Sequence, residues 1–280
     1  MAEASRHDAW QAGDSYEAYM GRWSRQVAPQ FLNWLAAPAN LDWLEVGCGT
    51  GALSAAIVAQ CRPRSLIAID PSEGFIAKAK AKAKAKAKAK AKANVSDKCA
   101  EFRVGDAQSL ALEDASQDMV VSALVLNFIP DKQKALAEMK RVARPGAIVG
   151  FYVWDYPGGG IEFMRAFWNA ATALDPKALD LTEGRRFPFC TGDQLTAMAE
   201  EAGMASVECR MIEVATVFAD FEDYWRPFTL GTRPAPGYCT SLDPGAQQRL
   251  KVRLQDTLPR QADGSIHLKA RAWAIKALVP

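Results

Sequence analysis

The sequence predicts an α/β protein built on a doubly wound, mostly parallel sheet. Apolar segments of strand character alternate with helical segments along most of the 280 residues, which is typical of parallel sheets covered by helices. The first strand, 41–46, leads directly into the glycine-rich loop GCGTG at 47–51, a turn that lets the backbone approach a ligand. The last segment, 265–278, alternates at period two and fits an edge strand that is free to run antiparallel.

The N-terminal part begins with a helix. Segment 15–36 carries apolar side chains at spacings of three and four, and Pro29 is a point at which this helix can kink or divide. The apolar run 41–46 predicts a buried strand, and the alanine-rich segment 52–60 predicts the helix after the glycine loop.

A second apolar strand, 65–70, is followed by a helix with Ser72 as its expected N-cap. This helix continues into the run 78–93, in which lysine and alanine alternate. Both are strong helix formers and weak strand formers, so we predict a helix despite the period of two. Its lysines spread around the whole axis, so we expect it to be exposed beyond its first turn or two.

In the middle of the chain, the sequence pattern predicts three strands and one helix. Segment 118–126 is almost continuously apolar, as a central parallel strand should be. The amphipathic helix is stopped by the pair Pro145 and Gly146. The predicted elements are strands 101–106, 118–126 and 147–156 and helix 131–143.

The C-terminal part adds further helices and two strands. Thr191 and Gln194 fit a capping box, and Gly203 fits the end of the same helix. The Pro- and Gly-rich segment 232–239 predicts a mobile loop. The predicted elements are helices 161–174, 191–203, 221–228 and 243–258 and strands 206–218 and 265–278.

The net charge of +2 averages two different regions. Lys and Arg total 34 and Asp and Glu total 32, but eight of the lysines lie in the run 78–93. The rest of the chain holds 26 basic and 32 acidic residues, a balance of −6. A broad nucleic-acid-binding face would spread Lys and Arg over the folded surface, so we expect no nucleic-acid partner.

Composition excludes several other classes. No run of about 18 apolar residues predicts a membrane span, and the N-terminus lacks the apolar core of a signal peptide. The six cysteines are scattered without metal-type spacing, so we expect reduced thiols in a cytoplasmic protein. Two histidines argue against a multi-histidine metal site, and we predict no metal.

The glycine loop and the end of the next strand carry the strongest functional signal. Residues 47–52 satisfy the pattern GxGxx(G/A), which is by itself weak support for NAD. Asp70 ends the second strand, at the position where a carboxylate accepts hydrogen bonds from ribose hydroxyls. Because NAD and S-adenosylmethionine both carry an adenosine ribose, these residues leave the two cofactors open.

Five motifs in order resemble the class I S-adenosylmethionine-dependent methyltransferases. They are EVGCGTG at 45–51, ID at 69–70, GDA at 105–107, DMVVSALVLNFIPD at 118–131 and RVARPGAIVGF at 141–151. Within that family the chain is similar to the ubiquinone/menaquinone-biosynthesis type, which methylates small molecules. The resemblance covers about 15–280.

The resemblance implies a Rossmann-like, seven-stranded sheet whose last strand is antiparallel. It also implies a single methyltransferase domain over 1–280, with an N-terminal helical cap at 15–36 and cap or lid insertions at 155–190 and 219–260. Its cofactor is S-adenosylmethionine, and its product is S-adenosylhomocysteine.

Cofactor contacts carry over from the family's motifs. The loop residues hold the methionine part, Glu45 lies near the ammonium group, and Asp70 binds the ribose. Pro71 and Ser72 flank the adenine, whose amino group Asp106 and Ala107 bind. The remaining implied contacts are Ser122 and Leu124 near the ammonium and methyl groups, Tyr16, Tyr19 and Arg22 over the carboxylate, and Gly47, Cys48 and Gly49 in the loop. Tyr16, Tyr19 and Arg22 fit a second interpretation equally well, in which they belong to an amphipathic helix that packs its aromatic rings.

Methyl transfer needs alignment and exclusion of water more than a catalytic side chain, because the sulfonium is an activated donor. The sequence assigns no catalytic residue. Asn127, Asp155 and Tyr156 end strands at the ligand-binding edge and are candidates only, while His267 and His7 fit structural or exposed positions.

Aromatic residues are dense in 155–190 and 219–245, which indicates either an apolar or aromatic acceptor or the core of a helical subdomain. The chain lacks an Asn-Pro-Pro-aromatic motif, which disfavours methylation of nucleic-acid bases or glutamine.

Two alternatives remain: an NAD-linked oxidoreductase that uses the same glycine loop, and a non-catalytic binding module that uses the Lys-Ala run. The oligomeric state is left open.

Overall fold

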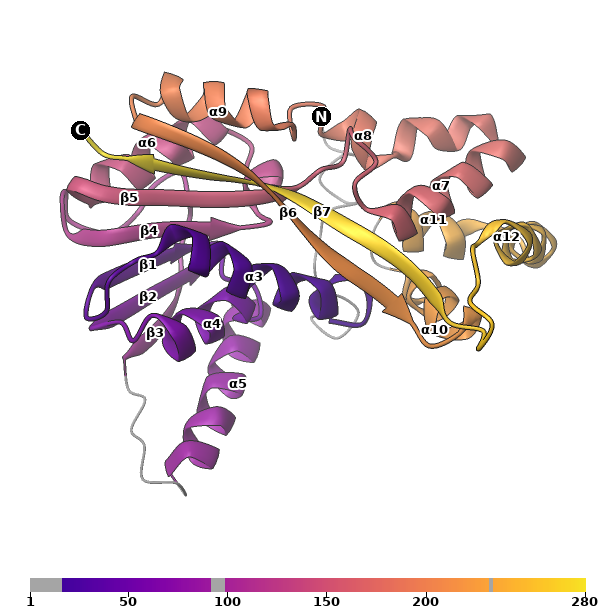
Figure 1. Cartoon of the computed structure of the whole chain (residues 1–280), viewed down its shortest axis with the longest axis horizontal. Helices are drawn as coiled ribbons and strands as arrows, with labels where there is room; N and C mark the ends of the chain where they lie inside the picture. The colour runs from indigo at the N-terminus through magenta and orange to yellow at the C-terminus, as the bar shows by residue number, and fades with distance from the viewer. Residues whose placement is uncertain (1–16, 92–98, 232–233) are drawn as a thin grey trace. The chain divides into compact units, whose positions relative to one another are not determined.

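The computed structural model describes residues 17–91, 99–231 and 234–280 and divides the chain into two compact units. The cap unit comprises the chain up to Trp23 together with 154–191 and 213–272, and the sheet unit comprises 24–153, 192–212 and 273–280. Figure 1 labels the helices and strands of both units. The predicted insertions 155–190 and 219–260 fall in the cap unit, and the predicted N-terminal helix passes from one unit to the other after Trp23.

A seven-stranded sheet in the order β3-β2-β1-β4-β5-β7-β6 forms the framework of the sheet unit. Parallel pairing places Val46 of β1 opposite Ile69 of β2 and Ser122 of β4. The carboxyl ends of these three strands are therefore level, which brings their following loops to one edge. The parallel strands are β1 (Asp42–Val46), β2 (Ser65–Asp70), β3 (Ala100–Val104), β4 (Gln117–Ala123) and β5 (Ala143–Trp154).

The last strand runs antiparallel, which confirms the predicted fold class. β7 (Ile266–Leu278) lies between β5 and β6 (Ala205–Phe218). The prediction of an edge strand at 265–278 was therefore wrong, because β6 pairs with the outer side of β7 and forms that edge of the sheet. The N–H of Gly146, early in β5, donates to the carbonyl of Val279 after the end of β7 over 2.8 Å, and the N–H of Val279 returns a bond to Ala147 over 3.0 Å. These bonds join the beginning of β5 to the end of β7, so the two strands run in opposite directions.

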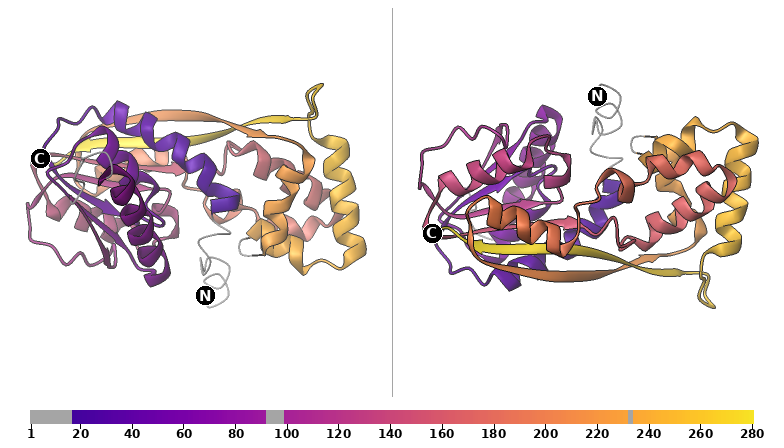
Figure 2. Two further views of the ribbon diagram at one scale, coloured as in Figure 1. Left: turned by 90° about the horizontal axis from the view of Figure 1, so that it is seen from below. Right: turned by 90° about the horizontal axis from the view of Figure 1, so that it is seen from above.

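Helices cover both faces of the sheet, as Figure 2 shows for α4 and α5 on one side and α6 and α9 on the other. Their N-caps follow the sequence: the Ser72 hydroxyl accepts from the N–H of Phe75, and the Asp131 carboxylate accepts from the N–H of Lys134. The bounds are α4 (Ala52–Gln60), α5 (Glu73–Ala91), α6 (Lys132–Val142) and α9 (Gly192–Glu201). A π-helical turn, η1 (Glu17–Gly21), precedes α3 (Arg22–Leu35), which continues through Pro29 without dividing.

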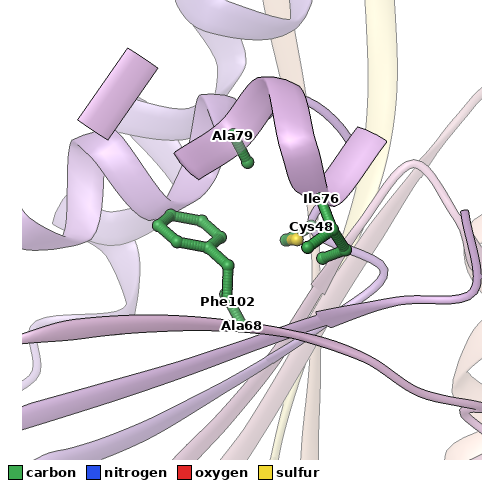
Figure 3. Packing of buried hydrophobic residues seen from close by; sticks show 5 residues of the cluster. All are labelled: Cys48, Ala68, Ile76, Ala79 and Phe102. Atoms are coloured by element: carbon green, nitrogen blue, oxygen red, sulfur yellow. The ribbon is translucent and has the colours of Figure 1, made fainter. Parts of the chain in front are cut away.

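The Lys-Ala run forms the predicted helix over its described residues, 78–91, since α5 is continuous from Glu73 to Ala91. Ile76 and Ala79 are buried, Ala83 is half-buried and Lys84 is exposed. Figure 3 shows Ile76 and Ala79 packed with Cys48, Ala68 and Phe102. Over residues 73–85, the part of α5 whose side chains the structure describes, full burial is confined to the first turns, as expected from a helix with no apolar face further along.

The cap unit has an aromatic core. Phe167 and Phe228 stack with ring centroids 4.3 Å apart, and both are buried. Phe163 and Phe218 pack edge-on at 5.8 Å, and the buried Tyr224 hydroxyl donates to the Phe163 carbonyl. The helical elements of this unit are α7 (Glu162–Leu174), η3 (Pro176–Leu181), α8 (Glu183–Arg186), α10 (Phe221–Trp225), η4 (Arg226–Leu230), α11 (Pro234–Ser241) and α12 (Pro244–Thr257).

The prediction of a loop at 232–239 was wrong for its described part, because α11 begins at Pro234. Proline is compatible with the first turn of a helix, where the missing N–H has no intrahelical acceptor. Among the described residues, no helix is long and apolar enough to cross a membrane.

Candidate functional site

The loops that follow β1, β2, β3 and β4 hold most of the predicted binding residues, and all of them belong to the sheet unit. In open α/β sheets this carboxyl edge is where ligands bind. The strand register explains why residues far apart in sequence gather there.

The glycine loop after β1 lies tightly against the end of β4. Gly47 has a φ of 77°, and a Cβ at this position would lie 2.4 Å from Cγ1 of Val125. Gly49 has a φ of 52°, but a Cβ there would meet no atom within 4 Å. The loop therefore packs closely at Gly47 and presents an open backbone face at Gly49.

Gly47→Ala is expected to destabilise the fold more than Gly49→Ala. Both replacements place alanine at a positive φ, which costs more than about 1 kcal/mol, but only alanine at position 47 also displaces Val125. Urea unfolding of the two variants measures the difference. Equal stabilities would contradict the close packing at Gly47.

Glu45 is a buried carboxyl group beneath the loop, with 1% of its surface exposed. It accepts a short hydrogen bond from the Ser54 hydroxyl. Burial raises the pKa of Glu45 to about 8, the Ser54 bond acts in the opposite direction, and the nearby Asp70 charge raises it further. The carboxyl group is therefore mostly protonated at neutral pH.

Asp70 joins the glycine loop to the start of α5. Its Oδ2 accepts from the N–H of Gly49 and its Oδ1 from the N–H of Ser72, each over 2.9 Å. Burial raises the pKa of this carboxyl group, and the two backbone bonds oppose that shift. A carboxylate oxygen can accept more than one hydrogen bond, so both oxygens keep capacity for ligand hydroxyls. Pro71 is exposed and Ser72 half-buried beside it.

Cys48 presents its backbone, and not its thiol, at the carboxyl edge of the sheet. Its side chain is 5% exposed and belongs to the apolar cluster under α5. Burial raises the pKa of the thiol far above its ordinary value, and the Glu45 and Asp70 charges add to that shift. A thiol that stays protonated is a poor nucleophile.

Asp106 follows β3 and is exposed. Its Oδ1 accepts from the backbone N–H of Gln108 over 2.9 Å, which fixes the carboxylate in a tight turn with the half-buried Ala107. The Gln108 side chain in turn accepts from the N–H of Asp131 over 3.0 Å. This chain of bonds ties the turn after β3 to the segment after β4.

Ser122 and Leu124 lie at the end of β4. The Ser122 hydroxyl is buried and donates to the Val46 carbonyl over 2.8 Å, which locks β4 to β1. Leu124 has a φ of 59°, and its N–H donates to the Tyr152 carbonyl over 2.8 Å. A leucine at positive φ is uncommon and is often found at functional sites.

Comparison with known proteins bears directly on this edge. A family model described as "Methyltransferase domain" matches residues 44–151, which include the end of β1, all of β2 to β4, most of β5 and all the loops described above. Residues 44–151 are therefore similar to a methyltransferase domain. The predicted class I resemblance is confirmed there, whereas the quinone-biosynthesis subtype stays a prediction.

One curated relative is an O-methyltransferase. The chain is 26% identical over 197 residues to the malonyl-(acyl-carrier protein) O-methyltransferase of Geobacter sulfurreducens, covering 69% of this chain and 67% of that relative. The chain spans about half to two thirds of the length of the curated relatives it matches.

Solved structures share the fold of the whole chain. Phosphoethanolamine N-methyltransferase 2 of Haemonchus contortus, in complex with phosphomonomethylethanolamine and S-adenosylhomocysteine, has a TM-score of 0.57 at 15% identity, covering 96% of this chain and 57% of that one. The 4+2-cyclase SpnF has a TM-score of 0.54 at 16% identity, covering 98% and 86%. At these identities the likeness shows the fold alone, and the cyclase illustrates that the fold does not fix the reaction.

Two predicted contacts of the methyltransferase domain lie in the cap unit rather than the sheet unit. Arg22 pairs with Asp223 over 3.0 Å, and its guanidinium lies 4.3 Å from the Trp23 ring and 4.6 Å from the Phe218 ring. Tyr19 is buried and packs edge-on against aromatic rings of the same unit. Within the cap unit, both residues therefore fit the alternative in which the N-terminal helix packs its aromatic rings. Tyr16 lies outside the described residues.

The cap unit also holds a cavity of about 380 Å³. Asp155 lines it, but its carboxylate is buried and bound to Arg271 over 2.7 Å and to the N–H of Gly158 over 2.9 Å. Sequence analysis missed Glu183, a buried lining residue that accepts from the Trp168 indole over 2.6 Å. The other lining residues include Tyr156, Ile161, Met164, Arg165, Asn169, Thr182 and Arg185.

Among the described residues, no group of three or more His, Cys, Asp or Glu is placed to hold a metal ion. His267 bonds to the Ser265 hydroxyl over 3.0 Å and is exposed.

Proposed function

We propose that this protein transfers a methyl group from S-adenosylmethionine to a small molecule and releases S-adenosylhomocysteine. The observation that carries the proposal is the Asp70 carboxylate, which holds the open backbone face of Gly49 with both oxygens still able to accept. A ligand with a ribose diol fits that arrangement. The methyltransferase-domain match over 44–151 supports the same cofactor.

Each part of the cofactor then has a proposed partner. Asp70 accepts from the ribose hydroxyls, and the main chain at 47–49 lies along the methionine part. Asp106 accepts from the adenine amino group, which its exposure after β3 permits. The neutral Glu45 carboxyl group lies beneath the ammonium group and ionises when that cation arrives.

The sulfonium of S-adenosylmethionine supplies an activated methyl group when the cofactor is bound. The acceptor's lone pair forms the new bond to the methyl carbon while the carbon–sulfur bond breaks and its electrons stay on sulfur. The protein's contribution is to hold the two reactants in line and to exclude water. We assign no general base, since an acceptor that is already deprotonated needs none.

Taken by itself, the cavity of the cap unit fits a small molecule with a ring and a polar group. Ile161, Met164 and Trp168 supply apolar walls, while Arg165 and Glu183 supply charge. The other dense aromatic residues of this unit pack on one another, so they add no argument for a purely apolar acceptor. One relative is named for malonyl-(acyl-carrier protein) and one solved structure for phosphoethanolamine, and both of these compounds have polar groups. The proposal also includes a cytoplasmic location and the absence of a nucleic-acid partner.

S-adenosylhomocysteine is expected to raise the melting temperature, whereas NAD at the same concentration is not. A ligand that binds only the folded state stabilises it by mass action, by about 2.7 kcal/mol at 100 times its Kd. Differential scanning fluorimetry measures both shifts. Stabilisation by NAD alone would overturn the proposal in favour of an oxidoreductase.

The binding-module alternative predicts a different result. Binding of an acidic polymer through the Lys-Ala run would weaken steeply with salt and disappear when 78–93 is deleted. The S-adenosylhomocysteine shift is expected to survive 0.5 M salt, because the contacts proposed for it are short and partly buried.

A further inference from the structure

Asn127 carries a buried amide with no hydrogen-bond partner among the described residues. It lies in the short 3-10 helix η2 (Leu126–Phe128) after β4, and 3% of its surface is exposed. Both its Oδ1 and its Nδ2 lack a partner. An unsatisfied buried amide costs about 1–3 kcal/mol per group, so native proteins rarely keep one without a reason.

The position of Asn127 in the chain connects the two ends of the candidate cofactor site. Two residues earlier, the Val125 side chain lies against Gly47 of the glycine loop. Four residues later, the N–H of Asp131 donates to Gln108 in the turn that holds Asp106. The segment from Val125 to Asp131 thus runs from the loop after β1 to the turn after β3, and Asn127 is nearer the glycine-loop end.

The chemistry of an amide matches one part of the proposed cofactor in particular. An asparagine offers two N–H donors and one carbonyl acceptor. The amino-acid end of S-adenosylmethionine presents a carboxylate that accepts and an ammonium that donates, whereas its adenine and ribose already have Asp106 and Asp70 as proposed partners. A single neutral side chain can serve both charges without adding a charge to a site that already holds Glu45 and Asp70.

We propose that Asn127 binds the amino-acid end of the cofactor through its side-chain amide. This assignment rests on the proposed function and adds a residue that secures the ammonium and carboxylate groups. It also gives the unpartnered amide its role, because the ligand supplies the missing acceptor and donor.

The test compares S-adenosylhomocysteine with 5′-methylthioadenosine, which has the same adenosine and sulfur but no amino-acid end. Asn127→Leu keeps the volume and removes the amide. Calorimetry is expected to show at least a tenfold loss of affinity for S-adenosylhomocysteine and an unchanged affinity for 5′-methylthioadenosine. Asn127→Ser, which is smaller and polar, provides a second variant if the leucine protein does not fold.

Gln117→Met is the matched control. Gln117 is also buried in β4 and its Oε1 also lacks a partner among the described residues, but it lies at the amino end of the strand. Its replacement is expected to leave both affinities unchanged.

The outcomes separate this inference from the proposed function. Wild-type protein that binds neither compound overturns the proposed function itself. Wild-type binding with an unchanged affinity of Asn127→Leu for S-adenosylhomocysteine overturns only the role of Asn127. Equal losses for both compounds, or a loss in Gln117→Met as large as that in Asn127→Leu, also overturn the assignment, because the effect then lacks specificity for the amino-acid end or for the site.

Discussion

Asp70→Ala is expected to lower the affinity for S-adenosylhomocysteine by about 100-fold or more. The carboxylate is proposed to accept from two ribose hydroxyls, and hydrogen bonds to a charged group contribute about 1.5–3 kcal/mol each. The same carboxylate holds the N–H groups of Gly49 and Ser72. Its loss therefore also releases the loop on which the ligand rests. Isothermal titration calorimetry measures the change.

Two further variants separate the direct contact from the loop effect. Asp70→Asn keeps the shape of the side chain and one acceptor oxygen, so we expect an intermediate loss. Glu101→Gln removes an acid that is exposed on β3 and paired with Arg103, and it is expected to leave the affinity unchanged. Full affinity in Asp70→Ala would rule out the ribose contact.

The sheet and its binding edge could be predicted because their signals are local. The apolar runs predict the strands, and the end of each run predicts where a loop begins. Gly47 follows β1, and Asp70 is the last residue of β2. Parallel register then brings these loops level, as Val46 opposite Ser122 shows. The N-caps at Ser72 and Asp131 follow from short side chains directly before helices.

The cap unit could not be predicted in the same detail because its contacts join distant segments. Arg22 forms an ion pair with Asp223, which lies 201 positions later in the chain. No local sequence pattern predicts such a pair. Glu183 is buried against Trp168 inside a region whose sequence shows only aromatic density. The helix at Pro234 was missed for the opposite reason, since a local rule that treats proline as a loop signal does not hold in the first turn of a helix.

Glu45 is expected to make the stability of the protein fall as pH rises through the neutral range. Its pKa is about 8 in the folded protein against an ordinary value of 4.5. Between these values the folded state keeps a proton that the unfolded state has lost, so raising the pH favours unfolding. The contribution is fully present below about pH 4.5 and is lost by about pH 8. From about pH 5.5 to about pH 7.5 the expected loss is about 2 kcal/mol.

Glu45→Gln isolates this contribution, because glutamine can still accept from the Ser54 hydroxyl but does not titrate. Urea unfolding of both proteins at each pH gives the two slopes, and the difference between them belongs to Glu45. Parallel slopes would show that Glu45 does not keep its proton in the folded protein.

The same group couples cofactor binding to pH. A cation placed beside a protonated carboxyl group lowers its pKa, so binding of S-adenosylhomocysteine is expected to release about one proton at about pH 7 and to strengthen as pH rises. Calorimetry in two buffers of different ionisation enthalpy counts the proton. Glu45→Gln should release none and should bind with little dependence on pH. Because Asp70 keeps its contacts in that variant, a lost pH dependence with retained binding would separate the ammonium end of the site from the ribose end.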